Sequence, residues 1–437
     1  MTRVLRTELR RSSAGALFLV LLVAGVGLLY SAPDVWAYGW MPVAMAERQY
    51  LILLWPLALA AGAWQSRREQ RSNVAELFAS TSRPLPQRVA PTLAVMAVAA
   101  ASGYLVVAAT TVPWIAHSAR YLPTAVFAVV AVGALSLVAA AWLGMAIGRL
   151  VPSPATAPVV AVAGIAVLLI LTPPVLGGRT WLAAMLSPTR GIGLFSDFRT
   201  VSGRVSAAQA LWLAGVAVTG TVLLAAGKRL TRVAALIPLL LGAGAALAVI
   251  PQGSAYVDSP IDRVAQQLVC AEGSPRVCVS RAHAGLLDVV TPRAREALRL
   301  LARLPDPPTS AVEDVNTFLD EHVQPYRADT VMFRIEIGGD GRLLNPDSFA
   351  MRMLYAGGMS EAPCPDGLDP AVSIAVAHWL MGEEPPAAAA EPDADIHSVW
   401  AGLHALPEQA AIDRVAAVRK AALACGDLAE ALAGGTA

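Results

Sequence analysis

Long runs of apolar residues without a charged side chain follow one another through the first 257 residues. A helix needs roughly 20 such residues to cross a hydrocarbon core of about 30 Å. Seven runs predict transmembrane helices, at residues 12–32, 49–66, 89–113, 123–148, 155–176, 206–227 and 233–251. Pro152, Pro154 and Pro158 lie where the fourth helix ends and the fifth begins, which leaves these ends least defined. None of the runs has the polar face that helices of soluble proteins present to water.

Residues 258–437 have a different pattern, which predicts an α+β domain. The pattern predicts helices at 308–322 and 407–424, a strand at 331–337 and a hairpin-type turn at 338–341. Residues 385–395, rich in proline, alanine and acidic side chains, predict an exposed loop or a short disordered insert. The chain thus divides into a transmembrane domain at 1–250 and a second domain at 258–437.

Composition and charge agree with this division. Apolar residues make up 56% of the chain and charged residues 15%, against about 45–50% and 25% in soluble proteins. Residues 1–257 hold 19 of the 33 Lys and Arg residues but only 6 of the 32 Asp and Glu, so the remainder holds 14 and 26. The net charge of +1 hides a basic part and an acidic part, and neither predicts a nucleic-acid partner.

The basic residues of the short connections predict the orientation, because Lys and Arg accumulate on the cytoplasmic side. Connections on the side of the N-terminus hold 13 of them and the opposite connections hold 6. The N-terminus is therefore expected in the cytoplasm, and seven crossings of the cell membrane place the second domain outside. The first run lacks a clear cleavage site, so we interpret it as a retained helix rather than a signal peptide. Aromatic residues are expected at the outer membrane interface at Tyr30, Trp36, Tyr38 and Trp40.

All four cysteines, Cys270, Cys278, Cys364 and Cys425, lie in the domain expected outside the cell. An even number of cysteines in an oxidising compartment predicts two disulfides. Three pairings are possible, and we favour Cys270 with Cys278 and Cys364 with Cys425. Zinc would need ligands at short spacing, which the sequence lacks, so no metal site is expected.

The sequence argues against ion-coupled transport, nucleotide binding and hydrolysis by this chain. The apolar runs hold no charged residue, and in the longer charge-free stretch 89–119 the only ionisable exception is His117, near its outer end. This argues against coupling to protons or sodium ions. Gly220–Lys228 has the wrong spacing for a phosphate-binding loop, and hydrolase signatures are missing. The chain is therefore not expected to be an enzyme, and any energy input is expected from another polypeptide.

The cytoplasmic connection at 67–88 is the most informative polar segment. Val74, Leu77 and Phe78 lie at helical spacing on one side, and Arg83-Pro84 ends the segment. A short amphipathic helix along the inner membrane surface would suit the docking of a soluble partner. By pattern alone, a solvated basic loop that follows the charge rule explains the segment equally well.

A family resemblance favours the docking interpretation. Glu76-Leu77 followed by Ser80-Thr81-Ser82-Arg83-Pro84, with Arg88 before the third helix, resembles the first cytoplasmic loop of type-2 ABC transporter permeases, especially actinobacterial ones. Leu186-Ser187-Pro188, in the outer loop before the sixth helix, is similar to a common feature of that family. The likeness covers roughly residues 1–230.

The resemblance implies a six-span permease, with both ends in the cytoplasm and a second permease protomer, whose loop seats in a cleft of a separate ATPase. The residues it implies for that contact are Arg71, Glu76, Leu77, Ser80, Thr81, Arg83 and Arg88. ATP and Mg²⁺ would be bound by the ATPase, and no cofactor is expected in this chain. The seventh helix and the outer domain depart from the family, and a seventh crossing is the least addition that exports a C-terminal domain. The stretch 277–283 and the end of the chain up to Cys425 resemble C-terminal domains of actinobacterial membrane proteins of unassigned role.

These observations lead to a membrane protein of about seven transmembrane helices with a C-terminal α+β domain outside the cell. The expected function is the permease subunit of an ABC-type exporter. The alternative is a non-transporting anchor that presents a sensing or binding domain. A third hypothesis, an outer-face enzyme using Asp320-Glu321-His322, is explained more simply by a solvated helix end.

Overall fold

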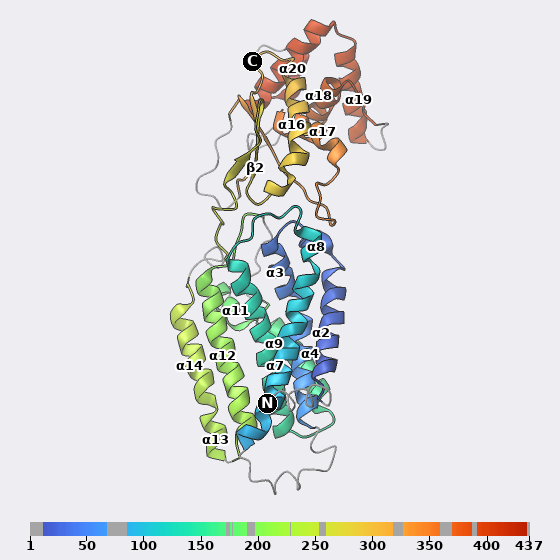
Figure 1. Ribbon diagram of the computed structural model, residues 1–437. Coiled ribbons are helices and arrows are strands. Elements are labelled where there is room, and N and C mark those ends of the chain that lie inside the picture. Colours follow the sequence, from blue (N-terminus) through green and yellow to red (C-terminus); the bar gives the residue numbers. More distant parts are fainter. Residues whose placement is uncertain are drawn as a thin grey trace. The chain divides into compact units, whose positions relative to one another are not determined.

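The computed structural model of the protein describes residues 12–67, 85–171, 175–176, 178–189, 197–227, 229–252, 259–317, 327–358, 369–386 and 391–434. The chain forms two compact units, which we describe separately. The first comprises Met1–His117 and Leu122–Asp262, and the second comprises Ser118–Tyr121 and Arg263–Ala437. Figure 1 shows that the first unit is a set of long helices and that the second combines helices with a small sheet.

Apolar helices build the first unit, each overlapping a run predicted from the sequence. They are α2 (Ala14–Leu29), α4 (Leu51–Ser66), α7 (Leu85–Thr110), α9 (Ala125–Leu150), α10 (Thr156–Ile170), α12 (Gly203–Ala225) and α14 (Leu236–Val249). Shorter elements between them are η1 (Pro33–Val35), α3 (Trp40–Gln49), α8 (Val112–Ile115), α11 (Thr180–Leu186) and α13 (Arg229–Ala234).

Four helical stretches of the described chain are long and apolar enough to cross a membrane. They are Gln87–Ile115, Ala125–Leu150, Gly203–Ala225 and Arg229–Val249. The helices α2, α4 and α10 are also apolar but have 16, 16 and 15 residues. Four helices thus support membrane association, and crossing by all seven remains a prediction.

Helix α9 is central to the first unit. It packs against α4, α7 and α12, while α10 packs mainly on α4 and α2 mainly on α7. The crossing of α4 and α9 is very close, because a Cβ atom on Gly62 would overlap the carbonyl of Ala141 and one on Gly144 would overlap the carbonyl of Leu59. Lipid gives no advantage to burying apolar surface between helices, so such small residues, which let backbones touch, stabilise the contact.

Helix α14 lies at the edge of the first unit. It packs along α12, where Gly242 meets Gly215 backbone to backbone. Ala246 is the only buried residue of α14, and Leu240 and Leu241 are 69% and 68% exposed. In a membrane this apolar surface would face lipid or another protein.

The aromatic residues before α3 include one that departs from expectation. Trp36, expected at the outer membrane interface, is fully buried, and its indole N–H donates to the carbonyl oxygen of Leu29 at 2.7 Å. The ring of Tyr30 packs edge-on against Trp36 and Trp114, and its hydroxyl donates to the carbonyl of Thr110 at 2.8 Å. Trp36 is buried because its single polar group finds an acceptor inside the protein.

The second unit has a four-stranded mixed sheet in the order β1-β2-β3-β4. The strands are β1 (Leu268–Cys270), β2 (Arg276–Ser280), β3 (Ser310–Glu313) and β4 (Thr330–Phe333). Strands β1 and β2 are antiparallel, whereas β2 with β3 and β3 with β4 are parallel. The helical elements are η2 (Ala284–Leu286), α16 (Leu287–Leu301), η3 (Pro346–Ser348), α17 (Phe349–Arg352), η4 (Met353–Gly358), α18 (Pro370–Met381), α19 (Glu391–His404), α20 (Glu408–Leu423) and α21 (Leu428–Ala433).

Helix α16 connects β2 to the parallel strand β3 and covers the sheet. Val290, Ala294, Leu298 and Leu301 lie on its buried face, at spacings of three and four residues. They join a core with the buried valines of β2 and with Phe333 of β4. A parallel strand pair needs such a crossover, which makes β2-α16-β3 the organising segment of this unit.

Two local predictions for the second unit are wrong. Residues 308–322 were expected to be helical, but Ser310–Glu313 form β3, where Val312 pairs with Cys278 on one side and Met332 on the other. Strand pairing on both sides outweighs the helical spacing of the apolar residues. The expected loop at 385–395 is interrupted because α19 begins at Glu391.

Other local predictions are confirmed, at least in part. Strand β4 covers the beginning of the expected strand at 331–337, and α20 matches the expected helix before Cys425. The predicted turn is present, since the N–H of Gly338 donates to the carbonyl of Arg342 at 2.8 Å and Gly341 has a φ of +73°. Only glycine adopts that backbone conformation without strain.

Replacing Gly144 by alanine is expected to destabilise the first unit. The new methyl group would force α4 and α9 apart, which costs about 1–3 kcal/mol. We expect a lower midpoint of thermal unfolding for the purified full-length protein. Gly27→Ala is the matched control, because a Cβ atom at Gly27 meets no atom within 4 Å and its midpoint should stay unchanged or rise. Equal midpoints for the two variants would contradict the close crossing.

Candidate functional site

The residues proposed for ATPase docking are hardly covered by the structure. Arg71, Glu76, Leu77, Ser80, Thr81 and Arg83 lie outside the described residues. Arg88 is described; it is half-buried in the first turn of α7. The docking surface therefore remains a prediction.

A buried arginine joins three segments of the first unit. Arg48 of α3 is 2% exposed, and its Nε and Nη2 donate to the carbonyl oxygen of Pro188 at 2.8 and 2.6 Å. Its Nη2 also donates to Oε1 of Gln209 on α12 at 2.9 Å. The guanidinium group is well suited to this role, because its donors are planar and fixed in direction.

Gln209 completes this network. Its Nε2 donates to the carbonyl oxygens of Ala184 and Ser187, at 2.5 and 3.3 Å, so both ends of the amide are used. The network thus anchors α3 and α12 to the end of α11, at the Leu186-Ser187-Pro188 segment that the family resemblance uses. Sequence reasoning missed Arg48 and Gln209, because Arg48 read as an ordinary outer-loop charge directly before an apolar run.

Glu47, the neighbour of Arg48, is also buried, but its carboxyl group lacks hydrogen bonds like those of Arg48. It is 1% exposed, and neither carboxyl oxygen makes a hydrogen bond of standard geometry with any described residue. The hydroxyl of Tyr104 and the backbone of Ala108 on α7 lie closest to it, and the Tyr104 hydroxyl is unpartnered too. The apolar runs hold no charged residue. Helix α3, however, carries two charged residues, Glu47 and Arg48, that are buried in the first unit.

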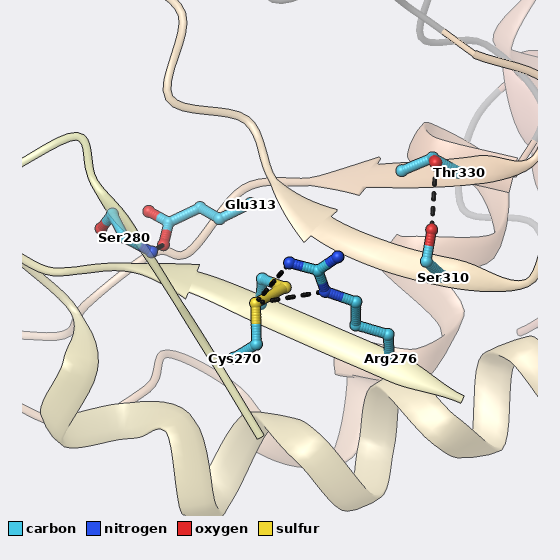
Figure 2. The surroundings of a disulfide bond; sticks show 7 residues. Cys270, Arg276, Ser280, Ser310, Glu313 and Thr330 are labelled. Carbon is cyan, nitrogen blue, oxygen red and sulfur yellow. Dashed lines mark hydrogen bonds between the residues drawn. A yellow bond between two sulfur atoms is a disulfide. The ribbon is translucent and has the colours of Figure 1, made fainter. Parts of the chain in front are cut away.

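The second unit holds a buried His-Glu pair at the ends of β2 and β3. Oε1 of Glu313 lies 2.5 Å from Nδ1 of His283, and Oε2 accepts from the backbone N–H of Ser280 at 2.6 Å. The Ser280 hydroxyl also lies 3.3 Å from Nδ1 of His283. Figure 2 shows Ser280 and Glu313 facing each other across the two strands. In a hydrolytic triad the serine and the acid use different ring nitrogens, so this cluster is structural.

The expected disulfide between Cys270 and Cys278 is present (Figure 2). The two cysteines face each other in the register of β1 and β2, with Cα atoms 4.0 Å apart. The guanidinium group of Arg276 donates to Sγ of Cys270 at 3.3 and 3.4 Å. Cys425 is also disulfide-bonded, whereas Cys364 lies outside the described residues, so the second pairing remains a prediction.

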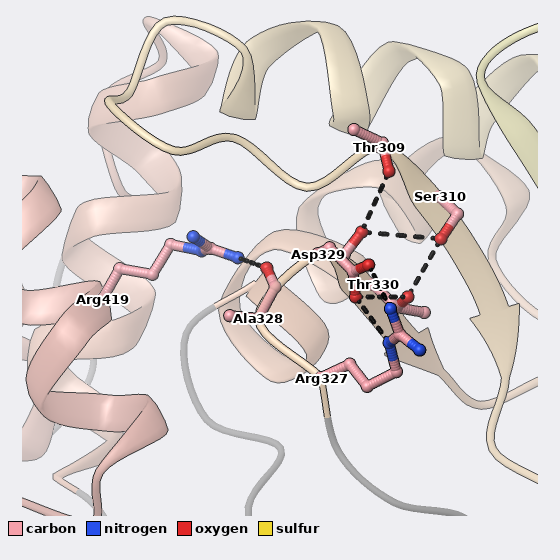
Figure 3. Close-up of polar contacts among 7 residues, drawn as sticks. All are labelled: Thr309, Ser310, Arg327, Ala328, Asp329, Thr330 and Arg419. Atoms are coloured by element: carbon pink, nitrogen blue, oxygen red, sulfur yellow. Dashed lines mark hydrogen bonds and ion pairs between the residues drawn. The ribbon is translucent and has the colours of Figure 1, made fainter.

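Arg419 ties α20 to two loops (Figure 3). Its Nη2 donates to the carbonyl oxygen of Ala328 at 2.7 Å and its Nη1 to that of Asp306 at 3.2 Å. Burial lowers the pKa of Arg419, and the Asp306 carboxylate opposes this shift. Beside it, the hydrogen-bonded guanidinium of Arg327 lowers the pKa of Asp329. Both contacts go to backbone carbonyl groups, so Arg419 connects α20 to these loops, while its buried Nε has no hydrogen-bond partner among the described residues.

Histidines do not gather in a metal site in the part of the chain that is described. No group of three His, Cys, Asp or Glu side chains there could hold a metal ion. Burial lowers the pKa of His378, and the carboxylate of Glu383 opposes it. Asp320, Glu321 and His322, the cluster of the enzyme hypothesis, lie outside the described residues.

Comparison with known proteins leaves the family open. No family model matches the chain, and neither a curated protein nor a solved structure matches it. The likeness to type-2 ABC permeases therefore remains a hypothesis based on the residues quoted above.

Replacing Glu313 by alanine is expected to destabilise the second unit. The substitution leaves the N–H of Ser280 and the ring of His283 buried without their partner, at a cost of about 3–5 kcal/mol. The midpoint of thermal unfolding should fall, and amide hydrogen exchange in β2 and β3 should accelerate.

The matched control for this prediction is Glu336→Ala. Glu336 pairs with Arg352 at 2.5 Å, but its side chain is 59% exposed. Surface pairs contribute about 0–1 kcal/mol, so exchange in β2 and β3 should be unchanged. A Glu313 variant that behaves like this control would contradict the structural role of the buried pair.

Proposed function

We propose that this chain is the permease subunit of an ATP-driven exporter, acting with a second permease protomer and a separate ATPase. The observation that carries the proposal is the layout of the first unit. Helices α2, α4, α7, α9, α10 and α12 form a packed group, whereas α14 packs mainly along α12 at its edge. A six-span permease with one added span would have this arrangement.

The proposed docking segment connects two helices of that group. Residues 67–88 connect the end of α4 to the first turn of α7, and both helices pack on α9. A push on the segment would therefore reach the centre of the unit through two helices. Closure of the ATPase on ATP would supply that push and change access to a route between the protomers.

The absence of charged residues from the predicted spans favours an amphiphilic substrate. The predicted spans hold no Asp, Glu, Lys or Arg. Since a charged solute would need polar groups along its path, a lipid-like or peptide substrate fits such a charge-poor route best. The disulfide of the second unit favours an oxidising compartment, which supports a location of this unit outside the cytoplasm.

A non-transporting anchor is the second candidate. The second unit has its own core, built from α16, the sheet and the C-terminal helices, as a sensing or binding domain would need. An anchor needs no ATPase, so association with an ATPase distinguishes the two functions.

Replacing Glu76 and Leu77 together by arginine is expected to abolish co-purification of the ATPase. The change reverses one charge and removes one apolar contact in the proposed docking segment, while the apolar runs that insert into the membrane are untouched. The measurement is pull-down of the partner ATPase that the proposal requires, with membrane insertion monitored in parallel. Glu272→Arg, at an exposed position of the second unit, is the matched control and should leave the pull-down intact. Undiminished association in the double variant would count against docking at 67–88.

Protease added to sealed right-side-out vesicles is expected to cleave the second unit. Seven crossings from a cytoplasmic N-terminus leave residues 258–437 outside, whereas the 67–88 segment stays protected inside. Antibody tags in each region would report the fragments. If the second unit became accessible only after the membrane was opened, the proposed topology would have to be abandoned.

A further inference from the structure

Glu47 is a buried acid whose carboxyl group the proposed function does not use. It lies on α3, between η1 and α4, and is 1% exposed. Both of its carboxyl oxygens lack a hydrogen-bond partner among the described residues. Buried polar groups are nearly always hydrogen-bonded, so this side chain requires an explanation.

The polar groups near Glu47 offset little of the cost of burying a carboxylate ion. The titratable and charged groups facing it are Tyr104 of α7 and Arg48 of its own helix. Arg48 donates two hydrogen bonds to the carbonyl oxygen of Pro188 and one to Oε1 of Gln209, and none of these goes to Glu47. The Tyr104 hydroxyl is pressed against Gly133 of α9, where a Cβ atom would overlap it.

Burial favours the neutral form of this carboxyl group, and Tyr104, Ala108 and Arg48 oppose that effect only in part. An ionised carboxylate accepts hydrogen bonds only, and moving it from water into an apolar interior is far more costly than moving the neutral acid. The neutral acid has one O–H donor of its own and can use the nearby Tyr104 oxygen as acceptor. Tyr104 and Ala108 lie one turn apart on the same face of α7, so both polar groups beside the acid belong to one helix.

We propose that Glu47 is a proton-binding site of the first unit, occupied by a proton in the conformation described. The proton is released to water only when α3 moves away from α7 and the carboxyl group becomes hydrated. Arg48, the next residue, anchors the same ten-residue helix to the α11–α12 connection and to Gln209. Proton release is thus linked to the breaking of that network, because both groups move with α3.

This inference goes beyond the exporter proposal and does not depend on it. The ligand is a proton, and the site is complete within this chain. An ATPase that fails to bind would leave the proton site unaffected, and an ionised Glu47 would leave the docking proposal unaffected.

Infrared difference spectroscopy of the full-length protein in lipid nanodiscs tests the proposal directly. At neutral pH the wild-type protein should show the carbonyl stretch of a protonated, buried carboxyl group. Glu47→Gln should remove this band, while Asp34→Asn should retain it, since Asp34 is an exposed carboxylate of the same unit. A wild-type spectrum without the band, or a band that survives in Glu47→Gln, would overturn the proposal.

The dependence of stability on pH gives a second readout. If the folded state holds a proton that the unfolded state releases, stability falls as pH rises above about 4, the ordinary range of a glutamate. Between about pH 5 and pH 9 the unfolding midpoint of the wild type should therefore fall relative to that of Glu47→Gln, which keeps the shape but cannot ionise. Identical pH profiles would overturn the proposal.

A third variant keeps the comparison available if glutamine at this position prevents folding. Glu47→Met also has a neutral side chain of similar volume. The wild-type midpoint should fall with rising pH relative to this variant as it does relative to Glu47→Gln, and the carbonyl band should again be missing. Tyr104→Phe, which removes the hydroxyl but no titrating carboxyl group, should keep the band and shift its frequency. A Tyr104 variant with an unshifted band would contradict the contact between the acid and the phenol.

Discussion

The first unit depends on how closely its helices can approach. In lipid, apolar side chains gain nothing by leaving their surroundings, so helices are held by van der Waals contact and by the few polar groups between them. Gly62 and Gly144 remove the side chains that would separate α4 from α9. This contact places α9 at the centre and lets α7 and α12 pack on its remaining faces. Helix α14, which meets α12 through Gly242, stays outside that group.

Hydrogen bonds from buried polar side chains hold the connections between helices in place. Arg48 and Gln209 use their donors on the carbonyl groups at the end of α11, so a charge inside the first unit is stabilised by fixed hydrogen bonds. Glu313 has the same role in the second unit, where it holds β2 and β3 together through Ser280 and His283. Glu47 differs from both, because neither of its carboxyl oxygens makes a hydrogen bond with a described residue. This contrast separates a structural charge from a group that can exchange a proton.

The two units therefore suggest different roles. The first combines a packed helical group with one flanking helix, the layout on which our proposal of an exporter subunit is based. The second has a compact core and a disulfide between adjacent strands, which suits a domain exposed to oxidising surroundings. The proton site proposed at the buried acid of α3 lies outside the predicted spans, where counting charges along the spans does not detect it.

The sequence by itself determined where the apolar helices lie and that two cysteines of the second unit pair, because these features depend on composition and spacing over a short stretch of chain. It did not reveal β3, since four residues of a strand carry too little periodicity to outweigh a helical pattern around them. The positions of Arg48 and Glu47 were decided only by the tertiary structure. Arg48 meets Pro188 across 140 residues of chain, and the burial of Glu47 arises from contact with α7. Local patterns carry no information about such distant partners, whereas folding brings them together.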